Sequence, residues 1–98
     1  MTLIRWTEQA AQDLEDIKTF ISKDSPAYAL AVVSKLYNAV SQLEIFPESG
    51  RIVPERGQSD IRELVRPPFR IVYRRRAEVI DILLVFRSSL PLPDIDYE

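Results

Sequence analysis

The sequence contains neither cysteine nor histidine. Without cysteine, the chain can form no disulfide, thiolate nucleophile or cysteine-ligated metal site. Without histidine, it lacks the usual general base and the commonest metal ligand, so Ser-His-Asp and Cys-His catalysis are excluded. Any chemistry must therefore use arginine, lysine, tyrosine, hydroxyl groups or carboxylates. The lack of cysteine also fits a reducing compartment such as the cytoplasm.

Long apolar runs and glycine-rich loops are lacking as well. Apolar runs such as Ile82 to Phe86 are far shorter than the roughly 20 residues that cross a bilayer. Met1 to Trp6 lacks the basic and apolar regions of a signal peptide. No loop has the ligand spacing of a calcium site or the glycines of a phosphate loop. We therefore expect a cytoplasmic protein with no metal, no cofactor and no membrane contact.

Charge is distributed unevenly along the 98 residues. Residues 1–50 carry four basic and seven acidic groups, residues 51–90 carry nine arginines and five acidic groups, and residues 91–98 carry three acidic groups and no basic one. The three segments have net charges of −3, +4 and −3, which together give the chain its charge of −2. A basic half that uses arginine alone suggests an anionic partner, either nucleic acid or an acidic peptide.

Two amphipathic helices are predicted in the first half. Thr7 and Ser25 are N-cap residue types, and Pro26 suits the first position of a helix. Apolar residues then recur at steps of three and four, the period of one helix face. They are Ala10, Leu14, Ile17 and Ile21, then Ala29, Val33, Leu36, Val40 and Leu43, with Leu30 and Tyr37 widening the second stripe. The pattern predicts helices over 7–23 and from 26 to about 46, packed as an antiparallel hairpin with mainly core-forming stripes.

The remaining segments predict strands. A short strand is expected over 3–6, a loop over 47–59, and further strands over 60–66, 69–74 and 79–87, with a turn at 75–78. The last strand is apolar on both faces and should therefore be central. The predicted fold is α+β with the order β-α-α-β-β-β, in which the helix hairpin packs on a small antiparallel sheet and the first strand joins its edge. We expect one domain over 1–90 and a mobile acidic tail over 91–98.

Four arginines form the main candidate site. Arg62, Arg66, Arg70 and Arg74 occupy even positions of two adjacent strands, so a simple hairpin would place them on one sheet face, and Arg87 could join them. Guanidinium groups gathered in this way would repel one another unless an anion lay among them. Alternatively, nearby carboxylates pair with them internally, namely those of Asp60, Glu63, Glu78 and Asp81.

RNA cleavage on this face would need a proton acceptor as well as arginine. Without histidine the acceptor would be Glu63 or a similar carboxylate, beside Arg62, Arg70 and Arg87. Tyr73 could serve as a proton donor, but it shares a face with Phe69 and Ile71 and is more readily interpreted as a core residue.

Several segments resemble, in order and spacing, the ParE-type toxins of the ParE/RelE superfamily. They are Trp6-Thr7 with Ala10, Asp13-Leu14 and Ile17; Ser25-Pro26; Leu43, Phe46-Pro47 and Gly50-Arg51; Ile61-Arg62-Glu63-Leu64; Phe69-Arg70-Ile71-Val72-Tyr73-Arg74; and Ile80-Asp81-Ile82-Leu83-Leu84-Val85. The resemblance covers residues 3 to about 87 and has the same order of elements.

The resemblance implies the toxin of a type II toxin–antitoxin pair, also called a plasmid stabilisation system. ParE proteins are associated with inhibition of DNA gyrase without a reaction of their own, whereas RelE relatives cleave mRNA in the ribosome. Arg62 and Arg70 fall where RelE enzymes place functional basic residues. In those relatives the last strand commonly ends in a histidine or a basic pair, with a tyrosine near the C-terminus. Here that segment is Val85-Phe86-Arg87-Ser88-Ser89-Leu90, which favours a ParE-like binding protein and leaves a non-toxic interaction domain as an alternative.

The resemblance also implies a partner protein. We expect a cognate antitoxin to lay apolar side chains along the helix hairpin and acidic ones near the arginines, as a helix in a groove or an added strand. The expected contacts on the hairpin are Leu14, Ile17, Ile21, Leu30, Val33 and Tyr37.

Overall fold

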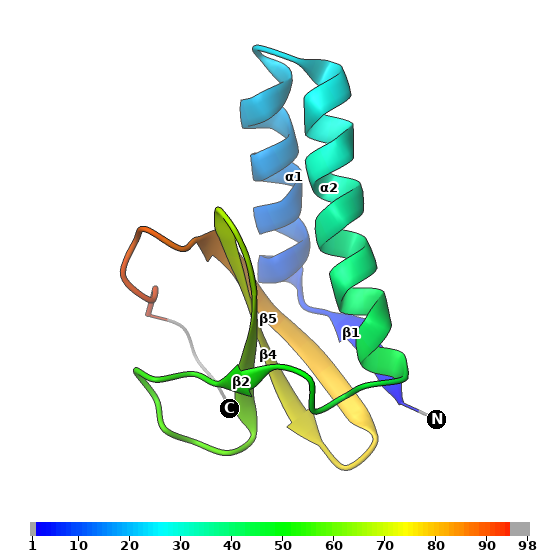
Figure 1. Ribbon diagram of the computed structural model, residues 1–98, viewed down its shortest axis with the longest axis vertical. Coiled ribbons are helices and arrows are strands. Elements are labelled where there is room, and N and C mark those ends of the chain that lie inside the picture. The colour runs from blue at the N-terminus through cyan, green and yellow to red at the C-terminus, as the bar shows by residue number, and fades with distance from the viewer. Residues whose placement is uncertain (1, 95–98) are drawn as a thin grey trace.

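The computed structural model describes residues 2–94. Its elements are β1 (Leu3–Trp6), α1 (Glu8–Ser22), α2 (Pro26–Ser41), the short 3-10 helix η1 (Gln42–Glu44), β2 (Arg51–Ile52), β3 (Ile61–Arg66), β4 (Phe69–Arg76) and β5 (Val79–Arg87). The five strands form one sheet in the order β1-β5-β4-β3-β2, and the two helices lie side by side against it (Figure 1). The predicted α+β class and element order are confirmed. β2 is an extra strand within the predicted loop, because two residues are too few to show a strand period.

The helices begin at the predicted caps. The hydroxyl oxygen of Thr7 accepts a hydrogen bond from the amide of Ala10, and that of Ser25 accepts one from the amide of Tyr28, both over 3.1 Å. The Thr7 hydroxyl also donates to the carbonyl oxygen of Ile82 over 2.6 Å, so the cap that starts α1 also ties it to β5. α2 ends earlier than predicted, at Ser41, and η1 continues the chain in a tighter helix.

β5 is a central strand, as its apolar sequence predicts. It pairs antiparallel with β4 on one side and parallel with β1 on the other, where Trp6 lies opposite Ile82. The first strand therefore does join the sheet, at its edge. A register shift beside Val72 and Tyr73 accommodates one extra residue in β5, Leu83, between the partners Ile82 and Leu84.

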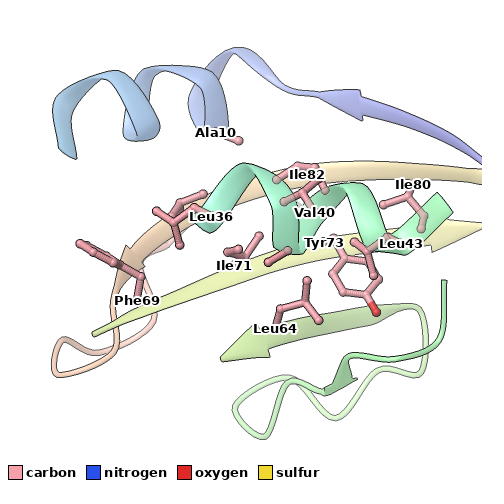
Figure 2. Packing of buried hydrophobic residues seen from close by; sticks show 12 residues of the cluster. Ala10, Leu36, Val40, Leu43, Leu64, Phe69, Ile71, Tyr73, Ile80 and Ile82 are labelled. Carbon is pink, nitrogen blue, oxygen red and sulfur yellow. The ribbon is translucent and has the colours of Figure 1, made fainter. Parts of the chain in front are cut away.

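Apolar side chains fill both faces of the sheet. Between sheet and helices, Leu36, Val40 and Leu43 pack with the inner residues of β3, β4 and β5, among them Ile71 and Tyr73 (Figure 2). A second cluster lies on the far face, and its buried members are Val53, Ile61, Val72, Leu83, Leu84 and Phe86. The loop after β2 supplies Val53 to this cluster, so both faces of β4 and β5 are covered.

The start of the predicted tail lies against the protein. Leu92 is half-buried and packs on the far-face cluster, so this part of the segment expected to be mobile is anchored by an apolar contact. Residues 95–98, with the rest of the predicted acidic tail, lie outside the described residues, and the division into 1–90 and 91–98 stays a prediction. Within residues 2–94 no helix is long and apolar enough to cross a membrane.

Candidate functional site

The five candidate arginines occupy both faces of the sheet, so the prediction of a single arginine face is wrong. The two-residue turn Pro67-Pro68 sets Arg66 opposite Phe69 and Arg62 opposite Tyr73. Residues directly opposite one another share a face, so even-numbered residues of β3 lie with odd-numbered residues of β4. Arg62, Arg66 and Arg87 therefore belong to the face that carries the helices, and Arg70 and Arg74 belong to the far face.

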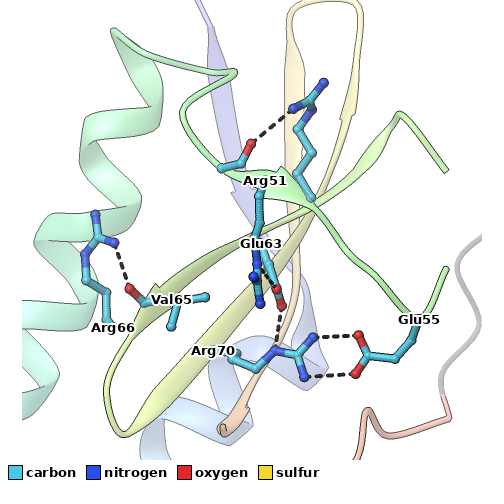
Figure 3. Close-up of polar contacts among 8 residues, drawn as sticks. Arg51, Glu55, Glu63, Val65, Arg66 and Arg70 are labelled. Atoms are coloured by element: carbon cyan, nitrogen blue, oxygen red, sulfur yellow. Dashed lines mark hydrogen bonds and ion pairs between the residues drawn. The ribbon is translucent and has the colours of Figure 1, made fainter. Parts of the chain in front are cut away.

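On the far face, Arg70 is buried and bound by two carboxylates (Figure 3). Its Nε donates to Glu63 Oε1 over 2.5 Å, and its two terminal nitrogens donate to Glu55 over 2.9 and 3.0 Å. Arg51 Nε donates to the other oxygen of Glu63 over 2.6 Å, and the Arg70 guanidinium lies 4.9 Å above the centre of the Phe86 ring. These contacts neutralise Arg70 within the protein. The hydrogen bonds between Glu55 and Arg70 lower the pKa of Glu55 and raise that of Arg70.

Arg74 belongs to a second ion-paired group on the far face. Asp81 accepts hydrogen bonds from Arg5 over 2.8 and 3.2 Å, and Arg74 Nη2 lies 3.4 Å from Asp81 Oδ2. The hydrogen bond from Arg5 is the main reason that the pKa of Asp81 lies below its ordinary value. Internal pairing by Glu63 and Asp81, one of the two alternatives that the sequence leaves open, is therefore present in the structure. Both carboxylates face the arginines across neighbouring strands.

The three arginines on the helix side have fewer anionic contacts. Arg62 Nη1 donates to the carbonyl oxygen of Gly50, and Arg66 Nη1 donates to that of Val65, over 3.1 and 3.0 Å. The Arg87 guanidinium lies 5.6 Å from the centre of the Phe69 ring and is exposed. Within residues 2–94 no carboxylate lies within ion-pair distance of these three side chains. They are the candidate arginines that remain open to a partner.

The residues considered for RNA cleavage are not brought into one exposed site. Glu63 is 1 % exposed and paired with two arginines, while Arg62 and Arg87 point to the other face. Tyr73 is fully buried, as its strand position predicts; its hydroxyl donates to Pro47 O and accepts from Gly50 N. A buried, doubly paired carboxylate is poorly placed to accept a proton from a ribose hydroxyl. Among the described residues, no group of three or more acidic side chains could hold a metal ion.

The six residues predicted to contact an antitoxin are spread over two hollows and an exposed face. Leu14, Val33 and Tyr37 line a hollow between the helices, which we call the hairpin groove. Trp6 lies in it too, with its ring stacked on Tyr37 at 6.3 Å between centroids. Ile17 and Ile21 line a different hollow, between α1 and the ends of β4 and β5. Leu30 lies in neither of these two hollows and is 62 % exposed.

Comparison with known proteins places this fold in a family. Residues 4–89 match the profile described as the ParE toxin of the type II toxin–antitoxin system parDE. A putative toxin, Y4kP of Sinorhizobium fredii, is 39% identical over 94% of each chain. Toxin RelE2 of Caulobacter vibrioides is 35% identical over 74% of this chain and 80% of its own. The chain therefore belongs to the ParE toxin family of type II toxin–antitoxin systems.

Solved structures agree with this assignment. A chain of the chromosomal ParDE toxin–antitoxin system of P. aeruginosa superposes with a TM-score of 0.72 and 29% identity, covering 89% of this chain and 96% of that one. A chain of the RelBE2 toxin–antitoxin complex of Mycobacterium tuberculosis shares the fold, with a TM-score of 0.56 and 22% identity over 89% and 98% of the two chains.

Sequence reasoning missed several residues of these sites. Arg51 and Glu55 lie in a segment predicted as loop, where no periodic pattern indicates which way a side chain points. Phe20 lines the same hollow as Ile17 and Ile21 but lies outside the apolar stripe that predicts the first helix. For Phe20 the sequence does contain a signal, because a large aromatic residue directly beside Ile21 cannot share the same narrow stripe.

Proposed function

We propose that this chain inhibits growth as a toxin and that a cognate antitoxin neutralises it by binding the helix hairpin. The hairpin groove supports this, because Trp6, Leu14, Val33 and Tyr37 offer apolar surface along two helices to an amphipathic partner. The P. aeruginosa relative, whose structure is that of a ParDE toxin–antitoxin system, has the same fold at 29% identity. Leu30, exposed on α2, extends the same partner surface.

We further propose that the toxin acts by binding DNA gyrase and not by cutting RNA. The observation against RNA cleavage is the burial of Glu63, the candidate proton acceptor, between Arg51 and Arg70. The choice of gyrase rests on the match to the ParE toxin family. A carboxylate held in a buried ion pair stabilises the fold, whereas arginines that reach solvent and have no carboxylate partner are suited to docking. Arg62, Arg66 and Arg87 are accordingly the first candidates for contacts with the target.

A supercoiling assay with purified gyrase tests the proposed target. Added toxin should inhibit supercoiling at micromolar concentration, and added antitoxin should restore it. Gyrase activity that is unchanged at that concentration would rule out the target. The matched control is the preformed complex with antitoxin, which should leave gyrase active.

A RelE-like, ribosome-dependent endoribonuclease is the second candidate, because Toxin RelE2 of Caulobacter vibrioides is 35% identical. Primer extension on translated mRNA after induction distinguishes it, since cuts in phase with codons are expected for this activity alone. A third outcome, normal growth of cells that overproduce the folded chain alone, would identify a non-toxic interaction domain.

A further inference from the structure

A shallow hollow of about 240 Å³ lies where the C-terminal half of α1 meets the ends of β4 and β5. We call it the corner groove. It is separate from the hairpin groove, and its lining residues are Asp16, Ile17, Phe20, Ile21, Phe69 and Arg87. Four of these six side chains are apolar. The groove is therefore suited to receive one large apolar side chain.

Phe20 is the most exposed apolar residue of the corner groove. Its side chain is 60 % exposed, whereas that of Phe69 on the opposite wall is 4 % exposed. Ile17 and Ile21 are half-buried. An exposed phenylalanine beside a hollow with apolar walls is the arrangement expected of a docking surface rather than of scattered surface apolar residues.

Two cations border this apolar surface. The ammonium nitrogen of Lys23 lies 5.9 Å from the centre of the Phe20 ring, and the Arg87 guanidinium lies 5.6 Å from that of Phe69. Over residues 2–94, neither cation has a carboxylate within ion-pair distance. Arg5 and Arg70, in contrast, are both ion-paired. Basic groups left unpaired beside exposed apolar surface favour an acidic partner.

We propose that the corner groove binds a peptide segment of the antitoxin in which one large apolar side chain is flanked by carboxylates. The apolar side chain would lie between Phe20 and Phe69, and the carboxylates would pair with Lys23 and Arg87. This inference rests on the proposed function and adds a second, charged anchor to the contact at the hairpin groove. Under this proposal Ile17 and Ile21 contact the antitoxin at the corner groove, whereas Leu14, Val33 and Tyr37 contact it at the hairpin groove.

A nucleic acid fits this surface less well than a peptide does. A phosphate backbone requires a continuous track of cations, whereas the wall of the corner groove carries the carboxylate of Asp16. Asp16 also accepts a hydrogen bond from Gln12 over 2.8 Å, which holds its negative charge on that wall. A peptide can place its acidic groups at the two cations and its apolar side chain between them.

Two substitutions with matched controls test the proposal. Toxin variants Arg87→Glu and Phe20→Ala are co-produced with the antitoxin encoded beside the toxin, and the affinity of each refolded toxin for the antitoxin is measured by calorimetry. Each variant should bind about tenfold more weakly than wild type or worse. The controls are Arg76→Glu, an exposed arginine at the far end of β4, and Phe46→Ala, a phenylalanine that is also 60 % exposed. Both controls should bind like wild type, and circular dichroism should show all four variants folded.

A charge exchange makes the test specific. Replacing the antitoxin carboxylate that faces Arg87 with lysine should weaken binding to wild-type toxin and restore binding to Arg87→Glu. Wild-type affinity in both Arg87→Glu and Phe20→Ala would overturn the corner groove while leaving the antitoxin proposal intact. Failure of the wild-type chains to form any complex would overturn both. Binding of a fluorescent RNA oligonucleotide that Arg87→Glu abolishes would overturn the peptide assignment in favour of nucleic acid.

Discussion

The amide of Gly50 donates a hydrogen bond to the phenolic oxygen of Tyr73 over 3.0 Å, although the two residues lie 23 positions apart. The same oxygen donates to the carbonyl of Pro47 over 3.1 Å. One buried side chain of β4 thus holds both ends of the turn that leads from η1 into β2. Gly50 also brings its carbonyl oxygen to Arg62, so this turn links the core to a candidate contact residue.

Gly50→Ala should destabilise the protein. A Cβ atom there would lie 2.5 Å from the Tyr73 oxygen and 2.7 Å from the backbone carbonyl oxygen of Glu63, closer than packing allows. Overpacking of this kind costs about 1–3 kcal/mol. Urea unfolding measures the loss, and Ser49→Ala at the exposed neighbouring position should change the free energy of unfolding by less than about 0.5 kcal/mol. A stability of Gly50→Ala equal to wild type would show that the turn can move away from β4.

Tyr73→Phe should remove about 1–3 kcal/mol, because it leaves the Gly50 amide and the Pro47 carbonyl without their buried partner. Burial raises the pKa of Tyr73 above its ordinary value of 10.0. A raised pKa in the folded state gives stability that is complete below pH 10 and is lost as the pH rises toward the folded-state value. Unfolding measured across this alkaline range should therefore show a shallower loss for Tyr73→Phe than for wild type. An identical slope in the two proteins would contradict the assignment.

Glu63→Gln should be far more costly than Glu55→Gln, although both acids bind Arg70. Glu63 is fully buried, so its loss removes the interior carboxylate that pairs with both Arg51 and Arg70 and leaves Arg70 only the pair with Glu55, at a cost of about 1.5–3 kcal/mol for each charged hydrogen bond lost. The Glu55 side chain is 42% exposed, and such a pair is worth about 0–1 kcal/mol. Glu63→Leu combined with Arg70→Met should cost less than the sum of the single changes, which a double-mutant cycle by urea unfolding would measure.

Asp81→Asn should make the free energy of unfolding less dependent on pH in the acid range. Because the pKa of Asp81 is lowered in the folded protein, chiefly by its hydrogen bond from Arg5, its contribution is present above pH 3.8 and is lost as the pH falls through the folded-state value. The free energy of unfolding should therefore fall less steeply below pH 3.8 in the variant. Arg5→Gln removes the same hydrogen bond at its donor and should likewise reduce the loss of stability at low pH. If both variants lost stability at low pH as steeply as wild type, other carboxylates would be responsible for the acid dependence.

Much of this fold could be predicted because its elements are locally consistent. Thr7 and Ser25 both form the caps that their residue types favour, and the apolar sequence of β5 does mark a central strand. The family assignment and the buried position of Tyr73 were also predicted correctly. Each of these rests on a signal within a few residues, or on order and spacing along the whole chain.

The arrangement of the arginines could not be predicted, because it depends on strand register. Because the turn between β3 and β4 has two residues, even-numbered residues of β3 lie opposite odd-numbered residues of β4. Arg62 and Arg70 therefore lie on opposite faces of the sheet. The sequence alone does not indicate how many residues of Arg66-Pro67-Pro68-Phe69 remain paired. The partners Arg51 and Glu55 come from an irregular segment whose path is set by tertiary contacts.

Arg66→Ala should weaken toxicity without unfolding the protein, if the arginines on the helix side contact the target. Arg66 hydrogen-bonds the carbonyl of its neighbour Val65, so its removal leaves no buried charge. Loss of one charge-assisted contact with the target, worth about 1.5–3 kcal/mol, should weaken binding roughly tenfold or more. Viable counts after induction, together with urea unfolding, measure both effects. Arg70→Ala should instead lower stability, because it leaves the buried Glu63 carboxylate with Arg51 as its one remaining arginine partner. Arg76→Ala should change neither property. Growth arrest by Arg66→Ala equal to that by wild type would move the target contact away from this side of the sheet.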